Sequence, residues 1–368
     1  MRVSSESELA EAIRDASGPL TVMGGGTRPV GRPVDGTPLS VAGISGIRLH
    51  EPGALTLVAA AGTPMTEIEA TLAAAGQRLP FEPMDHRALL RTEGSPTIGG
   101  AVATNASGPR RVLAGACRDS LIGVRFVDGT GQIVKNGGRV MKNVTGYDLV
   151  KLMAGSHGTL GVLSEVAFKV LPRPETEATL VLHGLPAEQA VAAMSAALGS
   201  PYEVNGAAHL PDGRTLLRIE GFAASVAYRS EALARQLAEH GRADPVSAHD
   251  SVALWAGVRD VAPHLDEPGD VWRLSVKPSD APGLAARAGG AALFDWGCGL
   301  VWLLRPEGED LRARLGAFQG HATLVRASHE TRARIAPFHP EIAPIAALSA
   351  GLRARFDPRG ILNPGLMG

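Results

Sequence analysis

Residues 94–108 read GSPTIGGAVATNASG, and this stretch decides what kind of fold the chain can adopt. Gly, Ser, Thr and Asn are packed densely here between apolar flanks, so the backbone can curl and expose successive N–H groups to a polyanion. The hydroxyl and amide side chains add further hydrogen-bond donors. A second small-residue turn, MGGGTR, lies far upstream at residues 23–28. Two such turns predict one pyrophosphate held from two sides, and therefore a bound dinucleotide.

The composition is that of a globular protein with more than one core. The chain has 368 residues, of which 45% are hydrophobic and 20% charged, and this length favours two domains. A net charge of −1 creates no field that would favour nucleic acid or an anionic membrane. The N-terminus lacks a signal-peptide core, and no apolar run approaches the roughly 20 residues of a membrane span. We therefore expect a cytoplasmic protein that reaches the inner face of the cell membrane only peripherally, through partners.

Cysteine and histidine patterns argue against a metal site. Cys117 and Cys298 are the only cysteines; they could pair, but two free thiols in a reducing cytosol is the simpler interpretation. Because an iron–sulfur cluster usually takes four thiolates, the chain cannot hold one by itself. The eleven histidines include no HExxH motif, and the residues after His209, LPDG, are good turn chemistry.

The first 174 residues mix helices and strands. A capping box of Ser5 and Glu8 starts a short helix, and Pro64 starts another that Gly76 ends. A further short helix is expected at 147–153. Pro172 and Pro174 stop the last strand and mark a domain boundary. The expected strands are 20–23, 55–60, 121–127, 132–134 and 162–171, with a hairpin between the third and fourth.

After this boundary the pattern changes to strand–helix–strand–strand–helix, and this order occurs twice. It predicts two split βαβ units packed side by side, the second with a closing strand at 323–326. The tail at 356–365, FDPRGILNPG, is rich in turn residues and taken alone indicates a frayed terminus. In the first βαβ unit the expected elements are a strand at 180–182, a helix at 186–198, strands at 202–210 and 215–220, and a helix at 225–240. In the second they are a strand at 271–276, a helix at 281–288, strands at 291–294 and 300–304, and a helix at 310–318.

Two common nucleotide-binding motifs are excluded. The Rossmann motif GxGxxG must open a long helix, whereas Gly31 is followed here by Arg32-Pro33, which is not a helix start. A Walker A loop is absent from the sequence. A nicotinamide-type Rossmann fold is therefore disfavoured.

Several polar residues allow two interpretations each. The pair Arg110 and Arg111 is either a solvated surface or a charge that closes over a phosphate or a carboxylate. Asp119 either caps a turn or contacts the cofactor's ribose. Arg273, flanked by apolar residues on an expected strand, either forms a surface ion pair or binds a carboxylate in a pocket. His321 is either a general base or a satisfied loop histidine.

Four segments together resemble a known family. In their order along the chain, they are similar to segments of FAD flavoproteins of the vanillyl-alcohol-oxidase type. They are the GGGT turn at 24–27, the glycine-rich stretch through Arg111, GSHGTLGVLSEVAFKVLPRP at 155–174 and FDPRGILNPG at 356–365. Further segments extend the resemblance over almost the whole chain, to the FAD-binding subunits of bacterial glycolate oxidases. These segments are GRPV at 31–34, VMKNVTGYDLVKLMAGS at 140–156, WRLS at 272–275, DWG at 295–297 and GHAT at 320–323.

The resemblance implies an α+β fold in three parts. A PCMH-type FAD-binding domain of two α+β subdomains is expected at 1–174. An α+β, ferredoxin-like cap domain is expected on the substrate side at 175–345. A C-terminal segment at 346–368 is expected to return to the FAD domain. The two turns would supply backbone N–H groups to the pyrophosphate, and residues after 157 would contact the adenine end. The expected cofactor-binding residues are Gly24, Gly25, Gly26, Thr27, Arg28, Ser95, Thr97, Ile98, Gly99, Gly100, Thr104, Asn105, Ser107, Gly108, Asp119, Gly158, Gly161, Val162 and Asn363.

The sequence departs from the family pattern in three ways. His157 stands where the family usually has Glu. The first glycine turn contains no histidine and Cys117 matches the cysteinyl-link position poorly, so we expect non-covalent FAD. The closely spaced histidine motif of the catalytic members is missing, so we expect no metal. Arg273 and His321 are then the only candidates for holding the substrate carboxylate and taking its proton.

The function implied is that of one subunit in a complex. Such a complex oxidises glycolate, with D-lactate as a further candidate substrate, to the 2-oxo acid. The implied partners are a homologous catalytic FAD subunit and an iron–sulfur subunit that receives the electrons. Two alternatives remain open at this point: a self-sufficient FAD-dependent 2-hydroxy-acid dehydrogenase, and a non-catalytic scaffold with a vestigial FAD site.

Overall fold

The computed structural model describes residues 1–138 and 146–368, so the first part of the VMKNVTGYDLVKLMAGS segment lies outside the described residues. Its contacts divide the chain into two compact units. Unit 1 consists of residues 1–107, 115–173 and 340–368, and unit 2 of residues 108–114 and 174–339. The short segment 108–114 therefore belongs with the second unit, although its neighbours in sequence on both sides belong to the first.

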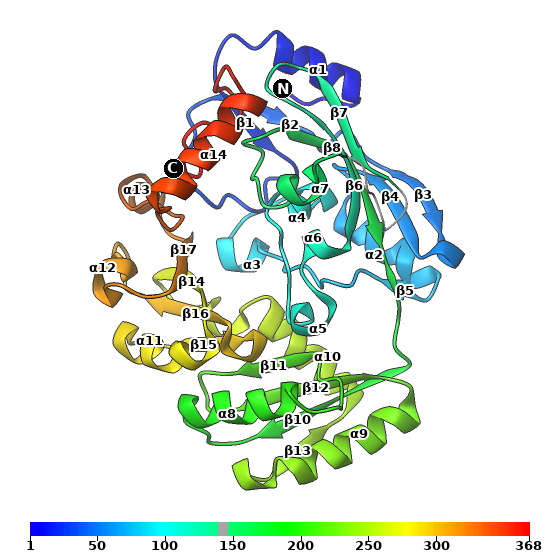
Figure 1. Ribbon diagram of the computed structural model, residues 1–368, viewed down its shortest axis with the longest axis vertical. Coiled ribbons are helices and arrows are strands. Elements are labelled where there is room, and N and C mark those ends of the chain that lie inside the picture. The colour runs from blue at the N-terminus through cyan, green and yellow to red at the C-terminus, as the bar shows by residue number, and fades with distance from the viewer. Residues whose placement is uncertain (139–145) are drawn as a thin grey trace. The chain divides into compact units, whose positions relative to one another are not determined.

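Unit 1 is built around a five-stranded antiparallel sheet in the order β3-β4-β8-β6-β7 (Figure 1). Its central strands are buried along nearly their whole length, because helices α4 and α7 contact them. Leu57, Ile68, Ile98, Phe126 and Phe168 are all fully buried in this core. The strands are β3 (Ile47–Glu51), β4 (Thr56–Ala60), β6 (Leu121–Val127), β7 (Ile133–Gly137) and β8 (Val162–Lys169).

The helices of unit 1 are short apart from three. Helix α2 begins after Pro64, which is its N-cap, and ends two residues before Gly76, as the sequence predicts. Helix α7 is capped by the Asp148 side chain, which accepts from the Lys151 N–H. The helices are α1 (Glu6–Arg14), α2 (Met65–Ala74), α3 (Arg87–Leu90), α4 (Ile98–Ala103), α6 (Cys117–Ser120), α7 (Leu149–Met153) and α14 (Ala343–Phe356).

A smaller layer of unit 1 combines α1 with two parallel strands, β1 (Leu20–Met23) and β2 (Thr37–Ser40). The Ser5 side chain accepts a hydrogen bond from the Glu8 N–H, which confirms the predicted cap. Leu9 and Ile13, one helical turn apart, are fully buried against this pair of strands. A two-stranded antiparallel ladder, β5 (Gln77–Arg78) with β9 (Leu171–Pro172), completes the unit.

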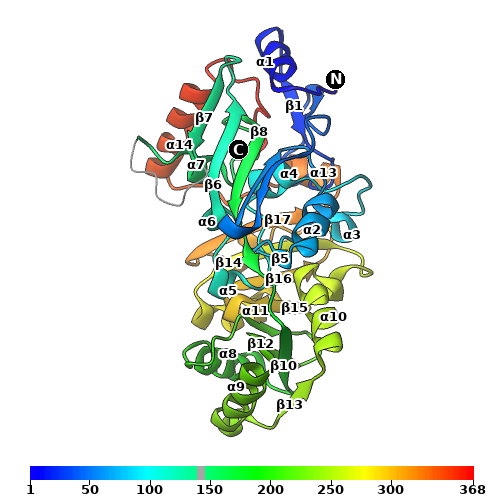
Figure 2. The same cartoon turned by 90° about the vertical axis from the view of Figure 1, so that its right-hand side faces the viewer.

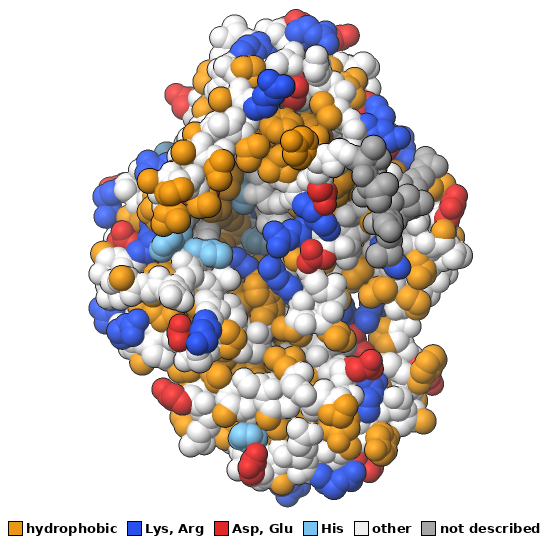
Figure 3. Space-filling view, viewed as in Figure 1, with side chains coloured by type: hydrophobic (Ala, Val, Ile, Leu, Met, Phe, Trp, Pro, Cys, Tyr) orange, Lys and Arg blue, Asp and Glu red, His pale blue; other side chains and the backbone are white. Residues whose placement is uncertain are grey.

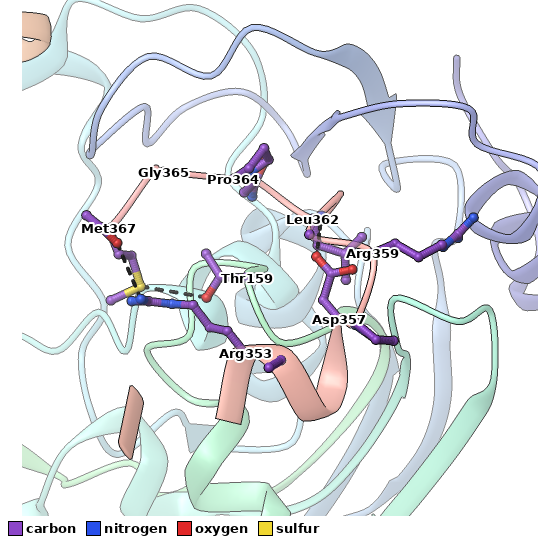
Figure 4. A pocket seen from close by; sticks show the side chains of 13 residues that line it. Thr159, Arg353, Asp357, Arg359, Leu362, Pro364, Gly365 and Met367 are labelled. Atoms are coloured by element: carbon purple, nitrogen blue, oxygen red, sulfur yellow. Dashed lines mark hydrogen bonds between the residues drawn. The ribbon is translucent and has the colours of Figure 1, made fainter. Parts of the chain in front are cut away.

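The C-terminal tail returns to unit 1 and is anchored there (Figure 4). Leu362 forms a parallel bridge with Leu20, and the Asp357 carboxylate accepts from the Leu362 N–H. The Asn363 side chain accepts from the Val22 N–H at 2.8 Å and donates to the His157 carbonyl at 2.9 Å. The interpretation of this tail as a frayed terminus is therefore wrong.

Asn363→Ala should destabilise unit 1. Asn363 is 2% exposed, and its loss removes the acceptor of the part-buried Val22 N–H and a donor to the His157 carbonyl, at a cost of about 1–3 kcal/mol. We expect a lower urea midpoint, measured by circular dichroism. Ser349→Ala, on the exposed helix α14 of the same unit, is the control and should leave the midpoint unchanged. Equal midpoints for both variants would show that the tail is not anchored by Asn363.

Unit 2 is an eight-stranded antiparallel sheet made of two similar halves (Figure 1). Each half runs strand–helix–strand–strand–helix–strand, and the sheet order β13-β10-β12-β11-β15-β16-β14-β17 places the two halves edge to edge. One residue pair, His209 with Phe294, joins them across β11 and β15. The predicted pair of split βαβ units is confirmed, and the first half also has a closing strand, β13, that the sequence analysis missed.

The bounds in unit 2 lie close to the predicted ones. The strands are β10 (Thr176–Leu182), β11 (Gly206–His209), β12 (Thr215–Gly221), β13 (Ala243–Val246), β14 (Asp270–Val276), β15 (Ala292–Asp295), β16 (Leu300–Arg305) and β17 (Gly320–Arg326). The helices are α5 (Arg111–Ala114), α8 (Ala187–Leu198), α9 (Ala223–Gln236), α10 (Ala248–Arg259), α11 (Ala281–Ala288), α12 (Leu311–Leu315) and α13 (His329–Arg334).

Helices cover one face of this sheet along both halves. Both views show α8 and α9 beside the strands of the first half (Figures 1 and 2). In the second half Trp272 and Leu274 of β14 are buried in the same core as Leu284 of α11 and Leu311 of α12. Helix α10, which the sequence analysis did not predict, contacts β10, and its Trp255 indole donates to the Thr179 hydroxyl.

Acidic and basic side chains are interspersed on the face seen in Figure 3, with no extended area of one sign. Within residues 1–138 and 146–368, no helix has the length and apolar character needed to cross a membrane.

Both Cys117 and Cys298 are free and buried, which confirms the expectation of two unpaired thiols.

Candidate functional site

The first glycine turn follows directly from strand β1. Gly26 has a φ of 72°, a left-handed conformation that a residue without a Cβ adopts at little cost. Among the described residues, none accepts a hydrogen bond from the backbone N–H groups of Gly24, Gly25, Gly26, Thr27 or Arg28. Five consecutive unsatisfied donors in one curled segment are what an anion-binding nest requires.

The second glycine-rich segment, at 94–108, already uses the backbone N–H groups of Ile98, Gly99 and Gly100 within the protein. Thr97 caps helix α4, and its hydroxyl accepts from the Gly100 N–H at 3.2 Å. The N–H groups of Ile98 and Gly99 donate to the carbonyls of Thr63 and Ala61. The expectation that Ile98, Gly99 and Gly100 offer backbone donors therefore needs correction, because the protein already uses these three.

The two segments lie in direct contact, although about 70 residues separate them in the sequence. A Cβ added at Gly25 would lie 1.7 Å from the Ser95 carbonyl oxygen, and one at Gly24 would lie 2.5 Å from the Thr97 hydroxyl. A Cβ at Gly94 would meet the Gly25 carbonyl oxygen at 2.4 Å. Only glycine permits this approach, so the glycines bring the two backbones together as well as bending each of them.

The turns share a cavity of about 70 Å³ within unit 1. Six of the predicted cofactor-binding residues line it: Gly24, Gly99, Gly100, Gly158, Gly161 and Val162. Seven other lining residues were missed: Val22, Met23, Val41, Ala61, Ala103, His157 and Leu163. All of these except His157 are apolar, and only Met23, Ala61 and His157 are directly followed by a glycine, so the sequence contained little signal for them.

A third segment, from His157 to Val162, closes the cavity. The His157 N–H donates to the Ala103 carbonyl, and a Cβ at Gly158 would lie 3.1 Å from the Asn363 amide nitrogen. A Cβ at Gly161 would lie 2.6 Å from the Phe126 ring, so the backbone runs directly over the core. Burial lowers the pKa of His157 to about 4, so this imidazole is uncharged at neutral pH.

Arg28 lies behind the first turn in a fixed orientation. Its guanidinium donates to the His86 ring nitrogen at 3.1 Å and to the Met84 carbonyl at 3.2 Å. Burial lowers its pKa to about 10, which leaves the group charged at neutral pH. A Cβ at Gly100 would lie 3.3 Å from this guanidinium. A positive charge is therefore held beside both turns.

Four other predicted residues hold the glycine-rich segment in shape. The Thr104 hydroxyl donates to the Gly100 carbonyl, and the Asn105 side chain accepts from the Arg118 N–H. The Ser107 hydroxyl accepts from the Cys117 N–H. Asp119 accepts from the Ala116 N–H and is exposed, so it acts here as a helix cap. Contact of these four with a cofactor stays a prediction.

Gly108 and the arginine pair after it belong to unit 2. The Gly108 carbonyl accepts from the Trp296 indole at 3.0 Å. Arg110 forms a bidentate ion pair with Glu220, in which both side chains are largely buried. Arg111 lies over the Trp296 ring, 4.4 Å from its centroid. Neither arginine is a simple solvated surface residue.

The remaining candidates also lie in unit 2. Arg273 and His321 are on adjacent strands, β14 and β17, and the pair Leu274–Ala322 lies between their positions in the register. His209 is buried and its ring shares a hydrogen bond with the Thr215 hydroxyl, while Asp212 pairs with Arg214. In the part of the chain that the structure describes, no three His, Cys, Asp or Glu side chains cluster as metal ligands would.

Comparison with known proteins first gives the class. A family model described as an FAD binding domain matches residues 1–137, which contain both glycine turns. The chain is therefore an FAD-binding protein, and FAD is its cofactor. The open donors of the first turn and the glycine contacts fit the diphosphate bridge of this dinucleotide.

The particular family follows from a relative that matches end to end. The chain is 35% identical to glycolate oxidase subunit GlcE of Escherichia coli, over 98% of this chain and 95% of that protein. It belongs to this family of FAD-dependent oxidoreductases. A shorter match, 45% identical over 85 residues, covers 23% of this chain and 18% of glycolate oxidase subunit GlcD of Bacillus subtilis.

Solved structures show the same fold. Alkyldihydroxyacetonephosphate synthase superimposes with a TM-score of 0.72 at 16% sequence identity, covering 99% of this chain and 76% of the synthase. The predicted α+β class with a PCMH-type FAD-binding domain is confirmed.

Gly25→Ala should separate the two turns. Its Cβ would overlap the Ser95 carbonyl, and relieving that overlap costs about 1–3 kcal/mol and displaces the donors. We expect the dissociation constant for FAD to rise roughly tenfold to hundredfold, measured by fluorescence titration of the apoprotein. Gly18→Ala is the matched control, because a Cβ there has nothing within 4 Å. Unchanged FAD affinity in Gly25→Ala would contradict the role given to the contact.

Protonation of His157 should destabilise the folded chain. Its pKa falls from 6.5 to about 4 on folding, so between these values the unfolded chain binds a proton that the folded chain excludes. The free energy of unfolding therefore decreases as the pH falls from 6.5 to 4, by roughly 1–3 kcal/mol for this group. His157→Gln should show a shallower loss in urea titrations across this range. His249→Gln, at an exposed position on α10, should follow the wild type.

Proposed function

We propose that this chain is the FAD-binding subunit of a glycolate oxidase complex. The complex would oxidise glycolate, and D-lactate as a second substrate, to the 2-oxo acid. Its partners would be a homologous catalytic FAD subunit and an iron–sulfur subunit that accepts the electrons. The chain would reach a membrane only through these partners.

One observation carries the FAD assignment. Among the described residues, none accepts from the five backbone N–H groups of the first glycine turn, and Gly24 of this turn lines a cavity together with Gly99 and Gly100 of the second. Backbone donors bind a diphosphate without the entropic cost of ordering long side chains, and the fixed charge of Arg28 adds attraction. We propose that residues 24–28 grip the pyrophosphate. Gly99, Gly100 and Gly158 would then leave room for it.

We propose that FAD is bound without a covalent link. The first turn contains no histidine, and Cys117 is fully buried on α6. Burial raises the pKa of the Cys117 thiol, so little of the nucleophilic thiolate forms at neutral pH. When bound, the flavin would supply the two-electron redox chemistry, and the protein would supply binding, orientation and exclusion of water.

Support for a complex comes from the relatives. The full-length match is named as one subunit of glycolate oxidase, and a second match, GlcD, is named as another. We infer that the oxidation needs the second subunit. The expected domains, 1–174 with the returning segment 346–368 and 175–345, are proposed to be the FAD-binding and substrate-side parts; their bounds lie near those of units 1 and 2.

A self-sufficient 2-hydroxy-acid dehydrogenase is the second candidate. It is favoured by a match to D-lactate dehydrogenase of Anaerostipes hadrus, 46% identical over 86 residues, although this covers only 23% of the present chain. A scaffold with a vestigial FAD site is the third candidate. The N–H groups of residues 24–28, for which the described part of the chain supplies no acceptor, argue against it, since a disused nest has no reason to keep such a series.

The purified chain should carry a flavin absorption band that acid precipitation releases into solution. Adding glycolate or D-lactate to the isolated chain should not bleach this band, whereas the reconstituted complex should bleach it. Bleaching of the isolated chain would support the self-sufficient dehydrogenase. A colourless chain that FAD cannot reconstitute would overturn the proposed function.

A further inference from the structure

The connection between β15 and β16 in unit 2 has a strained backbone. Trp296, Gly297 and Cys298 have φ values of 54°, 61° and 75°, so three consecutive residues are left-handed. Glycine adopts this conformation at little cost, whereas in other residues the Cβ comes too close to the following carbonyl oxygen. Asparagine, aspartate and glycine are the residues usually found at such positions. Here the chain places a tryptophan and a cysteine there, at a conformational cost.

Neighbouring groups hold this turn in its strained form. The Asp295 carboxylate accepts from the Trp296 N–H at 2.7 Å. A Cβ at Gly297 would lie 2.5 Å from the Leu198 side chain of α8, so the turn packs directly against that helix. Cys298 is buried in the core of the same unit. Strain of this kind persists only where the surrounding structure maintains it, and it is concentrated at functional positions.

The strained turn fixes the Trp296 ring against the segment 108–114. The indole N–H donates to the Gly108 carbonyl at 3.0 Å, and the Arg111 guanidinium carbon lies 4.4 Å from the ring centroid. The Arg273 guanidinium of β14 lies 5.2 Å from the same centroid. A ring next to two guanidinium groups is attracted to both of them. One side chain therefore contacts both the first residue of the segment and its helix α5.

A second contact fixes the same segment to strand β12. Arg110 forms a bidentate ion pair with Glu220 of that strand, and both side chains are largely buried. The Glu220 carboxylate also accepts from the Asn205 amide. Removing one member of a buried ion pair leaves the other without its partner, so such a pair is costly to open. Trp296 and Glu220 thus hold the segment from two elements of unit 2.

The segment begins where the glycine-rich stretch ends. Ser107 belongs to unit 1, where its hydroxyl accepts from the Cys117 N–H at 3.0 Å, and Gly108 belongs to unit 2. Consecutive Cα atoms lie about 3.8 Å apart across a trans peptide bond. Two adjacent residues are therefore held by different units, Ser107 by Cys117 and Gly108 by Trp296.

We propose that Trp296 is a positioning residue for the FAD site. By holding Gly108 and Arg111, it fixes the end of the stretch 94–108, whose Gly99 and Gly100 line the cavity of unit 1. A relaxed turn would direct the indole elsewhere, which accounts for the strain at 296–298. In this role Trp296 acts through the backbone of the stretch and needs no contact with FAD. This rests on the FAD site proposed above.

The test compares tryptic cleavage with FAD binding in Trp296→Ala and Trp296→Phe of the full chain. Trypsin cuts after arginine, so Arg110 and Arg111 report directly when the segment leaves unit 2. In Trp296→Ala we expect roughly tenfold faster cleavage after these residues under native conditions, because local opening becomes easier. The dissociation constant for FAD, from fluorescence titration of the apoprotein, should rise roughly threefold to tenfold. Trp296→Phe keeps a ring for Arg111 but no N–H for Gly108, so both values should be intermediate.

Tyr228→Ala is the matched control. Tyr228 is an aromatic residue on α9 of the same unit, and it is 65% exposed, so its loss should change neither value. Glu220→Gln tests the second contact without altering the strained turn. Because it removes the charge opposite Arg110, it should raise both values in the same direction. If Trp296→Ala fails to fold, judged by circular dichroism, Trp296→Phe and Glu220→Gln decide the question.

A purely structural role for Trp296 gives a different result. It lowers the urea midpoint and exposes tryptic sites throughout unit 2, while the affinity for FAD stays at the wild-type value. Unchanged FAD affinity in folded variants, or unchanged cleavage after Arg110 and Arg111, would overturn the positioning role. A wild-type chain that does not bind FAD counts against the FAD site itself, whereas equal FAD binding by the wild type and every variant counts against Trp296 alone.

Discussion

The close approach of two backbones at Gly25 and Ser95 is the constraint on which unit 1 depends. A Cβ at Gly25 would come within 1.7 Å of the Ser95 carbonyl oxygen, so no other residue type permits this contact. Because the contact is made between backbones, it positions the N–H groups of residues 24–28 without relying on any mobile side chain. The site therefore exists as a property of the fold, prepared before a cofactor arrives.

The two glycine turns use their backbone N–H groups differently. The first keeps its backbone donors open, whereas the second uses its own to hold α4 against the turn at Ala61 and Thr63. A buried or half-buried donor without a partner costs free energy, so an orphaned series is retained where a ligand satisfies it. Gly24 of the first turn and Gly99 and Gly100 of the second line one cavity, beside which we propose that the diphosphate lies.

The segment 108–114 belongs to a different unit from the residues on either side of it. It follows the glycine-rich stretch in sequence, yet its contacts belong to unit 2, where Gly108 and Arg110 bind Trp296 and Glu220. One continuous stretch thus contributes Gly99 and Gly100 to the cavity of unit 1 and, a few residues later, Arg111 to unit 2, where it lies over Trp296.

The sequence by itself determined the element order, since hydrophobic periodicity, caps and prolines act locally. It was enough for the helix after Ser5, the strand at 20–23, the helix at 281–288 and the repeated order in unit 2. It also indicated that the two glycine turns meet, because both have the small residues that would hold one pyrophosphate from two sides.

Only the tertiary structure decided which donors are open and which charges are paired. The amides of Ile98 and Gly99 were expected to face a ligand, but carbonyls brought in from Ala61 and Thr63 accept from them. Arg110 and Arg111 are equivalent in sequence, yet one meets Glu220 and the other Trp296. Helix α10, strand β13 and the apolar cavity residues were missed for the same reason: their places depend on partners distant in sequence, which local patterns do not encode.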